Sequence, residues 1–515
     1  MADQVKEVIE LTEKETMIFN RFKEVVNHNN LKTKLRVAGG WVRDKLLGKD
    51  CYDIDIAIDN MLGKQLCQLI YDYLLEQGED VNEFGIIPIN PEQSKHLETG
   101  RMYLYGELID FVNLRSEDYS QTQNPSDQSG PSEGSPTHCK KSRIPTMRFG
   151  SPQEDANRRD LTINSLFYNL NTNAVEDFTG RGIADLKLGK IVTPLSPKGT
   201  FLDDPLRVLR AIRFAARYNF TLDDGLKEAA SSEQVRESID EKLSRERIGQ
   251  EVDLMICGNQ PVKAVAYICD LQLFWTFFDC RPSVIQPLIP EACDRQCLAF
   301  VDAAWRLIQS LEAEAVSVSG DERRLCLYSA LFLPLRNMKY KYNNTKERYI
   351  VDHIFRNSLK LKSKDWDTVI MIHRATEKFA EIMSRLTTQE ANAQDGQESL
   401  KLRVLLTGLV MPEIKEFWQA ALLVSTLVVL YPNGEKSREL FMLVKDMITK
   451  QGLENIWETK PLFNGYEIKS ILKVNGPKVG EWQQKVVEWQ LANPSGTAQE
   501  CRVWMEKEWR RSENV

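Results

Sequence analysis

Two aspartates, Asp53 and Asp55, stand at alternate positions of an apolar run that continues to Ile58. Residues two apart on a strand point to the same face, so the two carboxylates would lie side by side and repel each other. That arrangement is costly unless divalent cations lie between them, and Mg²⁺ takes carboxylate oxygens together with substrate phosphates. The pair therefore predicts a two-metal Mg²⁺ site, with a solvated pair at a strand edge as the alternative.

A glycine pair precedes the aspartates. Gly39 and Gly40 are followed by Arg43, which stands ten residues before Asp53. A backbone without Cβ atoms can approach a triphosphate closely, and the turn that follows can direct N–H groups toward it. Arg43 would pair bidentately with phosphate oxygens. Together with the aspartates, this spacing indicates nucleotidyl transfer, whereas a lone Asp-x-Asp is a weak signal.

A third carboxylate is needed if one metal ion activates the attacking hydroxyl while the other stabilises the leaving pyrophosphate. Asp110 is the candidate, because it stands in the apolar segment from Leu108 to Leu114. An acid flanked by apolar neighbours on a strand favours a functional role over a simple edge-strand position. We therefore predict Asp110 as a catalytic residue beside Asp53 and Asp55.

A second motif runs from Arg158 to Leu166. Read as a helix, it places Asp160 and Asn164 one turn apart, with Arg158 and Arg159 at its start. Cations at a helix N-terminus oppose the macrodipole, and a triphosphate nearby would relieve that conflict. This favours nucleotide binding by Arg159, with Arg158 and Asn164 beside it, over a salt-bridged helix end.

A further motif runs from Asp203 to Phe214 and predicts a helix with Asp204 as N-cap and Pro205 in its first turn. Cytosine and adenine both present an amine donor beside a ring-nitrogen acceptor. The carboxylate of Asp204 beside the guanidinium of Arg207 complements that pattern and mismatches uracil and guanine. The pair predicts a site that accepts C and A without a template. The alternative is a capped amphipathic helix whose charged face, with Arg207, Arg210 and Arg213, lies in solvent.

Two other motifs carry smaller expectations. The Gly-rich segment 176–186 joins the first part of the chain to the helical part, and we interpret it as a turn or hinge without a catalytic residue. The segment 243–251 is typical of a charged helix start, and we expect it to support the nucleotide-binding helix.

The elements that position these motifs suggest an α+β protein. Residues 35–58 predict strand, glycine turn, short helix and strand; 85–89 and 101–114 are further strand candidates, and from residue 202 the apolar periodicity is helical. A Ser-, Pro-, Gln- and Gly-rich segment at 120–146 predicts a flexible insertion, and 387–398 predicts a linker. We expect an α/β head at 1–198, then an all-α neck at 199–260, body at 261–386 and tail at 387–515.

Bulk properties exclude several classes of protein. The chain has 515 residues, enough for about three or four structural units. No apolar run is long enough for a membrane span, and the acidic N-terminus lacks secretory or transit composition, which places the protein in the cytoplasm or nucleus. Ten scattered cysteines predict reduced, mostly buried thiols rather than a zinc site. A net charge of −7 argues against a broadly basic nucleic-acid binder, so any RNA contact must be regional.

One region has the opposite charge balance. From residue 336 to 365, nine Lys and Arg stand against three acids, which gives +6, and Tyr340, Tyr342 and Tyr349 lie among them. Phosphate contacts supply most nucleic-acid affinity, so this segment is a candidate RNA contact. A solvated helix face is an equally good interpretation of the charges alone.

Taken together and in this order, the motifs between residues 35 and 255 resemble those of the class II branch of the polymerase-beta nucleotidyltransferase superfamily, specifically the eukaryotic CCA-adding enzymes. The resemblance implies a head, neck, body and tail, and addition of C, C and A to the 3′ end of tRNA lacking all or part of CCA, with CTP and ATP. It implies Asp53 and Asp55 as metal ligands, Asp110 as the third acid, and a nucleotide site of Gly39, Gly40, Arg43, Arg158, Arg159, Asn164, Asp204, Arg207, Arg210 and Arg213.

The chain departs from that family at Asp203, where the family commonly has Glu; the base-facing pair is unaffected. The resemblance also implies a mobile loop at 83–99 that helps the switch from C to A. We expect a monomer without membrane contact, and a mitochondrial form if an upstream start exists. A poly(A) polymerase of the same superfamily and a catalytically silent tRNA-binding protein remain the alternatives.

Overall fold

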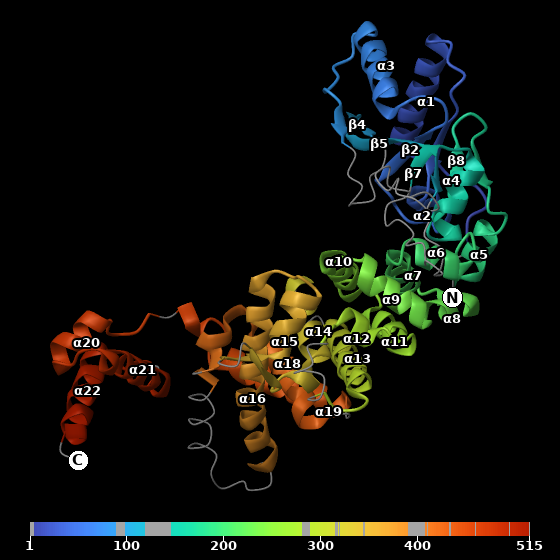
Figure 1. Cartoon of the computed structure of the whole chain (residues 1–515). Coiled ribbons are helices and arrows are strands. Elements are labelled where there is room, and N and C mark those ends of the chain that lie inside the picture. Colours follow the sequence, from blue (N-terminus) through green and yellow to red (C-terminus); the bar gives the residue numbers. More distant parts are fainter. Residues whose placement is uncertain are drawn as a thin grey trace, which may run out of the picture. The chain divides into compact units, whose positions relative to one another are not determined.

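The computed structural model describes residues 5–88, 98–118, 146–280, 289–314, 318, 320–342, 346–389, 407–408, 410–431, 434–458, 460–493 and 495–513. The chain forms two compact units, 1–276 and 277–515 (Figure 1). The finer division into head, neck, body and tail stays a prediction. The expected insertion up to residue 145, residues 89–97 of the expected loop and most of the expected linker lie outside the described residues.

The first unit contains a mixed seven-stranded sheet of order β3-β4-β5-β2-β1-β8-β9. Within this sheet only β2 and β5 pair in parallel; the other neighbours are antiparallel. The central strand β1 is buried throughout, and its one charged residue, Arg36, pairs with Glu176 on β9 at 2.6 Å. The strands are β1 (Leu35–Ala38), β2 (Ile54–Ile58), β3 (Gly85–Ile87), β4 (Thr99–Leu104), β5 (Glu107–Asn113), β8 (Leu166–Asn169) and β9 (Ala174–Asp177).

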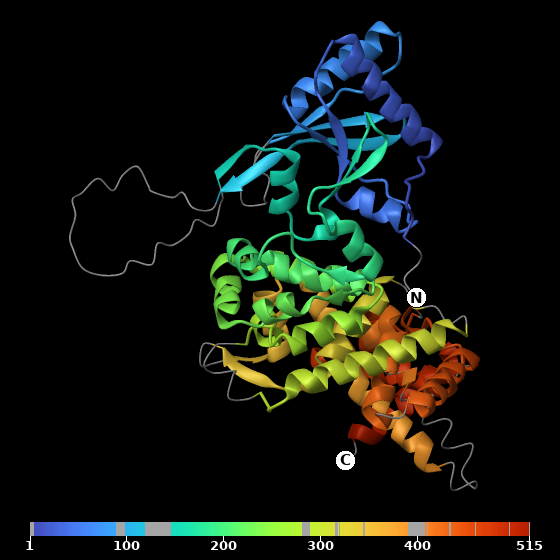
Figure 2. The ribbon, with the colours of Figure 1, turned by 90° about the vertical axis from the view of Figure 1, so that its right-hand side faces the viewer.

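Helices α1 (Glu13–His28) and α3 (Gly63–Glu76) cover one face of this sheet, as Figures 1 and 2 both show. Thr12 and Glu15 form a capping box that fixes the start of α1 at Glu13. Its apolar stripe buries Phe19 and Phe22 against the sheet. The opposite side holds α2 (Gly40–Leu46) and α4 (Pro152–Arg158), which border the motifs.

Two short pairs of strands lie outside the main sheet in this unit. Strands β6 (Arg115–Asp118) and β7 (Thr146–Phe149) are antiparallel, and β10 (Lys190–Ile191) and β11 (Thr221–Leu222) are parallel. The helices that follow the head are α5 (Gly182–Leu188), α6 (Pro197–Asp203), α7 (Leu206–Arg217), α8 (Asp224–Ala230), α9 (Glu233–Lys242), α10 (Arg245–Ile256), α11 (Pro261–Asp270) and α12 (Phe274–Phe277).

Helix α7 is the amphipathic helix expected from the motif at residues 203–214. Val208, Leu209, Ile212 and Ala216 are buried, as their spacing predicts. It begins one residue later than expected, with Pro205 preceding it, and the side chain of Asp204 accepts a hydrogen bond from the N–H of Leu206 at 3.1 Å. The apolar side of α7 packs on α10 and α11. The side that carries Arg207 and Arg210 faces the cleft of the head.

The second unit is mainly helical. It contains α13 (Cys293–Glu312), α14 (Gly320–Leu331), α15 (Ile350–His353), α16 (Ser363–Gln389), α18 (Trp418–Leu430), α19 (Gly434–Lys450), α20 (Gly465–Leu472), α21 (Pro477–Ala492) and α22 (Ala498–Glu513). Within it, α16 packs on α18, and α20 to α22 share a core centred on Trp482. The expectation of an all-α remainder is wrong at one place, because β12 (Lys339–Tyr342) and β13 (Lys346–Tyr349) form an antiparallel hairpin.

Among the described residues no helix is both long and apolar enough to cross a membrane. The cysteines in the described ranges are free thiols, and all of these except Cys51 and Cys257 are buried.

The second unit also buries a histidine. His373 on α16 is buried, with its Nε2 2.8 Å from the carbonyl oxygen of Ser329 on α14. Burial lowers the pKa of His373 to about 4, from an ordinary value of 6.5. His373 therefore becomes protonated below pH 6.5 in the unfolded chain, but only below about pH 4 in the folded unit.

We predict that His373 makes the second unit acid-sensitive. Its contribution to the free energy of unfolding is fully present above pH 6.5 and is lost as pH falls toward 4, by about 3 kcal/mol at most. His373→Gln keeps a donor near Ser329 and should flatten this pH dependence in denaturant titrations between pH 4 and 7. His28→Gln, at an exposed site on α1, is the control and should not. An equally steep decline in H373Q would contradict the assignment.

Candidate active site

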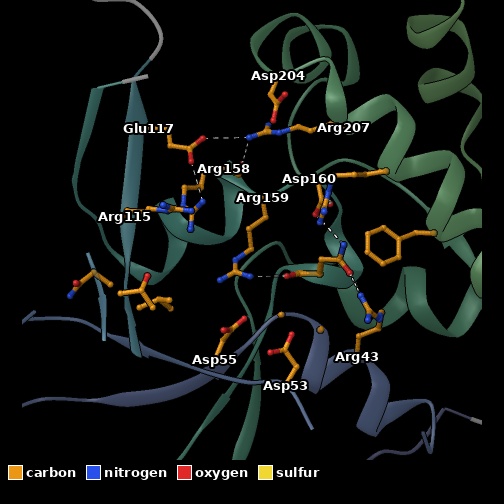
Figure 3. A pocket seen from close by; sticks show the side chains of 18 of the residues that line it. Arg43, Asp53, Asp55, Arg115, Glu117, Arg158, Arg159, Asp160, Asp204 and Arg207 are labelled. Carbon is orange, nitrogen blue, oxygen red and sulfur yellow. Dashed lines mark hydrogen bonds and ion pairs between the residues drawn. The ribbon is translucent and has the colours of Figure 1, made fainter. Parts of the chain in front are cut away.

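A cleft of about 520 Å³ opens in the first unit between the sheet and α7. Figure 3 shows its side chains. It collects residues that the sequence spreads over more than 150 positions, because the strand ends of β2 and β5, the turn before α2, the end of α4 and the start of α7 meet there. The predicted residues that line it are Gly39, Gly40, Arg43, Asp53, Asp55, Arg158, Arg159, Asn164, Asp204, Arg207 and Arg210.

The two aspartates lie at the floor of this cleft. Asp53 is the exposed residue before β2, and Asp55 is the second residue of β2. Burial, together with the charge of Asp53, raises the pKa of Asp55 to about 7. Two carboxylates that resist being charged together fit a divalent cation, which would relieve both the desolvation and the repulsion. The donor set is therefore chemically suited to a metal ion.

Among the described residues, no group of three or more His, Cys, Asp or Glu side chains is placed so that it could hold a metal ion by itself. The remaining ligand positions would have to come from substrate phosphates and water, which is the usual situation for Mg²⁺. Asp110 comes nearest to being a third acid, because the parallel pairing of β2 and β5 places it opposite Asp55. This adjacency agrees with the role expected for it.

The carboxylate of Asp110 is nevertheless engaged. Both of its oxygens accept hydrogen bonds from Arg101 on β4, at 2.6 Å from Nε and 2.6 Å from Nη2. Asp110 is absent from the cleft lining in this arrangement. Arg101 escaped the sequence analysis, because its pairing with Asp110 follows from the β4–β5 register rather than from sequence spacing. A catalytic role for Asp110 requires that it share or release this arginine, and stays a prediction.

The glycine turn has a specific neighbour. Gly39 has φ +72°, and a Cβ atom at this position would lie 2.8 Å from Nη1 of Arg159. A glycine is therefore required both for the backbone conformation and for the approach of the guanidinium. Arg159 donates from Nη1 to the carbonyl oxygen of Asn164 at 3.2 Å, so the arginine bridges the turn and the second motif.

A buried acid that the sequence analysis missed holds both arginines of the second motif. Asp155 on α4 accepts from Arg158 through Oδ1 at 2.6 Å and from Arg159 through Oδ2 at 2.9 Å. Burial would raise the pKa of Asp155, but the adjacent Arg159 and Arg158 outweigh burial and lower it. The signal was present, since Asp155 stands three and four residues before the two arginines on one helix.

The helical interpretation of residues 158–166 is wrong. Ser151 and Glu154 form a capping box that starts α4 at Pro152, so this helix ends at Arg158, and a short 3₁₀ turn (Thr162–Asn164) follows. The arginines therefore lie at a helix C-terminus, where the macrodipole favours cations, and not at the N-terminus. Asp160 and Asn164 still meet, because Nδ2 of Asn164 donates to Asp160 at 3.1 Å.

Asp160 connects this motif to α7. Its Oδ2 accepts from Nε of Arg210 at 2.7 Å. Burial would raise the pKa of Asp160, but Arg210 and the hydrogen bond from Asn164 outweigh it and lower the pKa to about 2. The acid is therefore charged at every physiological pH, and it fixes Arg210 at the cleft.

Arg43 is not placed as expected. Its Nε and Nη2 donate to the two carboxylate oxygens of Asp44 at 2.8 and 3.0 Å, and its Nη1 donates to the side chain of Asn164. The bidentate fork that we expected to take phosphate oxygens is thus occupied by the neighbouring acid. Tyr218 supports this arrangement by donating from its hydroxyl to Asp44 at 2.7 Å. Arg43 lines the cleft and, in this structure, orients the side chain of Asn164.

The arginines of α7 do not form a solvent face. The side chains of Arg207 and Arg213 are only 11% and 12% exposed. Arg207 donates to the carbonyl oxygen of Arg158 at 2.6 Å and lies 3.4 Å from Glu117 on β6. Arg213 lies outside the cleft lining and pairs with Glu251 on α10 at 2.6 Å. The segment 243–251, which begins α10, therefore contacts α7, and its support of a nucleotide-binding helix stays a prediction.

The fold and the cleft define a nucleotidyltransferase, in which paired carboxylates lie beside a glycine turn and arginines held in fixed positions. A family model described as the poly A polymerase head domain matches residues 35–192. The CCA tRNA nucleotidyltransferase, mitochondrial, of Candida glabrata is 33% identical over 96% of this chain and 95% of its own. The Saccharomyces cerevisiae protein of the same name is 32% identical over 90% of this chain and 86% of its own.

Among solved structures, the Thermotoga maritima CCA-adding enzyme complexed with tRNA superimposes with a TM-score of 0.60 at 18% identity, over 97% of this chain and 96% of that one. This likeness concerns the fold. The chain belongs to the CCA tRNA nucleotidyltransferase family, as the two full-length relatives show. The resemblance inferred from the five motifs is thereby confirmed.

We predict that Gly39→Ala lowers kcat at least about tenfold, because the added Cβ displaces Arg159 from the turn. The matched control is Gly78→Ala, which has the same φ of +72° with no neighbouring atom within 4 Å. Both substitutions strain a backbone at positive φ, and Gly39 has in addition a ψ of −119°, so the loss of stability has to be measured for each variant. Steady-state incorporation assays alongside thermal unfolding separate the two effects. Equal losses of kcat in G39A and G78A would contradict the role given to Arg159.

Proposed function

We propose that this chain adds C, C and A in turn to the 3′ end of tRNA, using CTP and ATP without a template and releasing pyrophosphate. The observation that carries the proposal is the meeting of the carboxylate pair and the candidate base-selecting pair in one cleft. A poly(A) polymerase would share the carboxylates. The full-length relatives of both yeasts favour CCA addition over that alternative.

Asp53 and Asp55 would hold Mg²⁺. When bound, Mg²⁺ would neutralise charge on the transferred phosphate and lower the pKa of the attacking 3′ hydroxyl. The chain itself contributes the position of the triphosphate. Gly39 and Gly40 allow close approach of the backbone at the start of α2, and Arg159 lies over that turn.

The remaining cleft side chains organise this site rather than all touching phosphate. Arg158 is held by Asp155 and Glu117, so its charge is largely balanced, although it lines the cleft. Asn164 and Arg210 are linked through Asp160, and Arg43 orients Asn164. We assign direct phosphate contact to Arg159, and sugar or phosphate contact to Asn164 and Arg210.

Base choice is assigned to Asp204 and Arg207 on the other side of the cleft. The carboxylate of Asp204 would accept the exocyclic amine of C or A, and the guanidinium of Arg207 would donate to the ring nitrogen. Figure 3 shows the two side chains together at the cleft. The carbonyl oxygen of Arg158 fixes one end of the Arg207 guanidinium, which limits how the base can be read. Uracil and guanine would leave a buried donor or acceptor unpaired, at about 1–3 kcal/mol each.

We predict that the pair Asp53 and Asp55 is needed for transfer itself, whereas the pair Asp204 and Arg207 is needed for base choice. Asp55→Ala should abolish incorporation of every nucleotide, by at least about a thousandfold in kcat, because the metal ligands are lost. Asp204→Ala should keep transfer but admit UTP and GTP. The measurement is single-nucleotide incorporation on a tRNA that ends before CCA, with each NTP alone and with CTP and ATP together. If D204A instead lost activity as fully as D55A and kept its discrimination, the base assignment would be wrong.

The same assay separates the candidate activities. CMP incorporation that precedes a single AMP supports CCA addition. Runs of AMP without CMP would support a poly(A) polymerase, and tRNA binding without incorporation would support a silent binding protein.

The β12–β13 hairpin is the proposed tRNA contact of the second unit. Lys339, Lys341 and Lys346 project from it, with Lys341 and Lys346 exposed and Lys339 lying 5.1 Å from the ring of Tyr349. Tyr340 is buried against His353 and therefore belongs to the local core, not to an RNA-stacking surface. The helix-face interpretation is wrong for residues 339–349, which form a hairpin, whereas residues 350–358 and those from 363 onward are helical.

We predict that changing Lys339, Lys341 and Lys346 together to Gln weakens tRNA binding about tenfold or more and lowers the slope of log Kd against log salt by about two to three. CTP and ATP choice should not change, since these lysines lie in the other unit. The control changes three exposed lysines of the first unit, Lys32, Lys34 and Lys64. Filter binding at several salt concentrations gives the answer, and an unchanged affinity would remove the hairpin from the interface.

We propose in addition a cytoplasmic and nuclear location, with a mitochondrial form if an upstream start exists; the names of both yeast relatives, which contain the word mitochondrial, support the second part. Fluorescent fusions made with and without the upstream coding region would show where each form resides.

A further inference from the structure

Arg115 is a cleft arginine that has no role in the site described so far. Arg115 is the first residue of β6, two positions beyond the end of β5, and it lines the cleft. Its backbone is firmly placed: its N–H donates to Asp155 at 3.1 Å, and the strand pairs with β7 opposite Phe149. Gly150 allows that close approach, since a Cβ atom there would overlap the Arg115 backbone.

The guanidinium of Arg115 differs from its neighbours. Arg158 and Arg159 are paired with Asp155, Arg207 with Glu117 and Arg210 with Asp160. Within the part of the chain that the structure describes, the side chain of Arg115 has neither a hydrogen bond nor an ion pair. It is partly buried, and burial together with the charge of Arg158 lowers its pKa to about 10, although the charges of Glu117 and Asp155 act in the opposite direction. Such a cation is costly unless an anion from outside completes the site.

The reaction brings two anions into the cleft, the triphosphate and the RNA backbone. In Figure 3, Arg115 and Arg43 lie on opposite sides of the cleft, with Arg159 between them. The glycine turn belongs to the Arg43 side, because Gly40 and Arg43 share helix α2. In nucleotidyl transfer the attacking hydroxyl and the leaving pyrophosphate lie on opposite sides of the phosphorus. Arg115 is therefore on the side from which the RNA 3′ end must approach.

We propose that Arg115 binds a backbone phosphate of the RNA 3′ end and so positions the attacking hydroxyl. This inference rests on the proposed function of the cleft. Arg115 is the unpaired counterpart of Arg159: one arginine serves the triphosphate, and the other serves the acceptor strand. The fixed backbone of β6 means that little side-chain ordering has to accompany binding, and a guanidinium takes phosphate oxygens bidentately.

The test uses a tRNA acceptor minihelix that ends before CCA, made with its last one or two internucleotide phosphates either normal or replaced by neutral methylphosphonate. Wild-type protein, Arg115→Gln, Arg115→Lys and the control Arg148→Gln are compared. Arg148 lies on β7 of the same hairpin, 73% exposed, and is not part of the cleft. The readouts are KM for the minihelix, KM for CTP, kcat and the salt dependence of minihelix binding.

Loss of one charge-assisted contact should raise the KM of wild-type protein for the methylphosphonate minihelix about tenfold. R115Q should show that same increase with the normal minihelix and no further increase with the modified one. R115K should recover part of the loss, the salt slope of R115Q should fall by about 0.7, and KM for CTP should stay unchanged. R148Q should behave as wild type.

Three outcomes would overturn the assignment while leaving the proposed function intact. These are wild-type kinetics in R115Q, a raised KM for CTP with an unchanged KM for the minihelix, and equal sensitivity of wild type and R115Q to the methylphosphonate. Failure of wild-type protein to add CMP to the normal minihelix would instead overturn the proposed function itself. Far-UV circular dichroism and thermal unfolding of R115Q and R115K identify any loss caused by misfolding.

Discussion

The repulsion between Asp53 and Asp55 is the constraint on which the rest of this active site depends. Asp55 on β2 and Asp53 just before it both line the cleft, and the parallel partner β5 places Asp110 opposite Asp55. Burial, and after it the charge of Asp53, raises the pKa of Asp55, so the charged pair is disfavoured without a counter-ion. A divalent cation with a triphosphate makes this geometry favourable, so the site is built for a ligand that the chain does not itself contain.

The arginines of the motifs are held by acids, most of which are buried, and of these acids Asp160 and Glu117 themselves line the cleft. Asp155, Asp160, Asp44 and Glu251 are buried, and each receives at least one charged hydrogen bond from an arginine of the motifs. Such pairing balances the charge of each arginine and also fixes the orientation of its guanidinium. A guanidinium that is hydrogen-bonded along one edge can offer only its other edge to a ligand. The cleft is thereby preorganised, which is where enzymes of this type obtain most of their rate enhancement.

Much of the head was predictable because its signals are local. The glycine pair, the alternation at Asp53 and Asp55 and the stripe of α7 each specify structure within a few residues. The bounds of α4 were not predicted, because Ser151 and Glu154, which fix its start, stand before the motif. The engagement of Asp110 by Arg101 and of Arg43 by Asp44 required knowledge of strand register and burial. At Lys339–Tyr342 the alternation of Lys and Tyr has the period of a strand, but the surrounding helical pattern concealed it.

The central claim is that the carboxylate pair is strained without a metal ion and relieved by one. Thermal unfolding at pH 8 of wild-type protein and Asp55→Asn, each with and without Mg²⁺ and CTP, tests it most directly. The account predicts that D55N has the higher Tm without metal, and that Mg²⁺ with CTP raises the Tm of the wild type but leaves that of D55N nearly unchanged. A lower Tm for metal-free D55N, or an equal increase in both proteins, would contradict it.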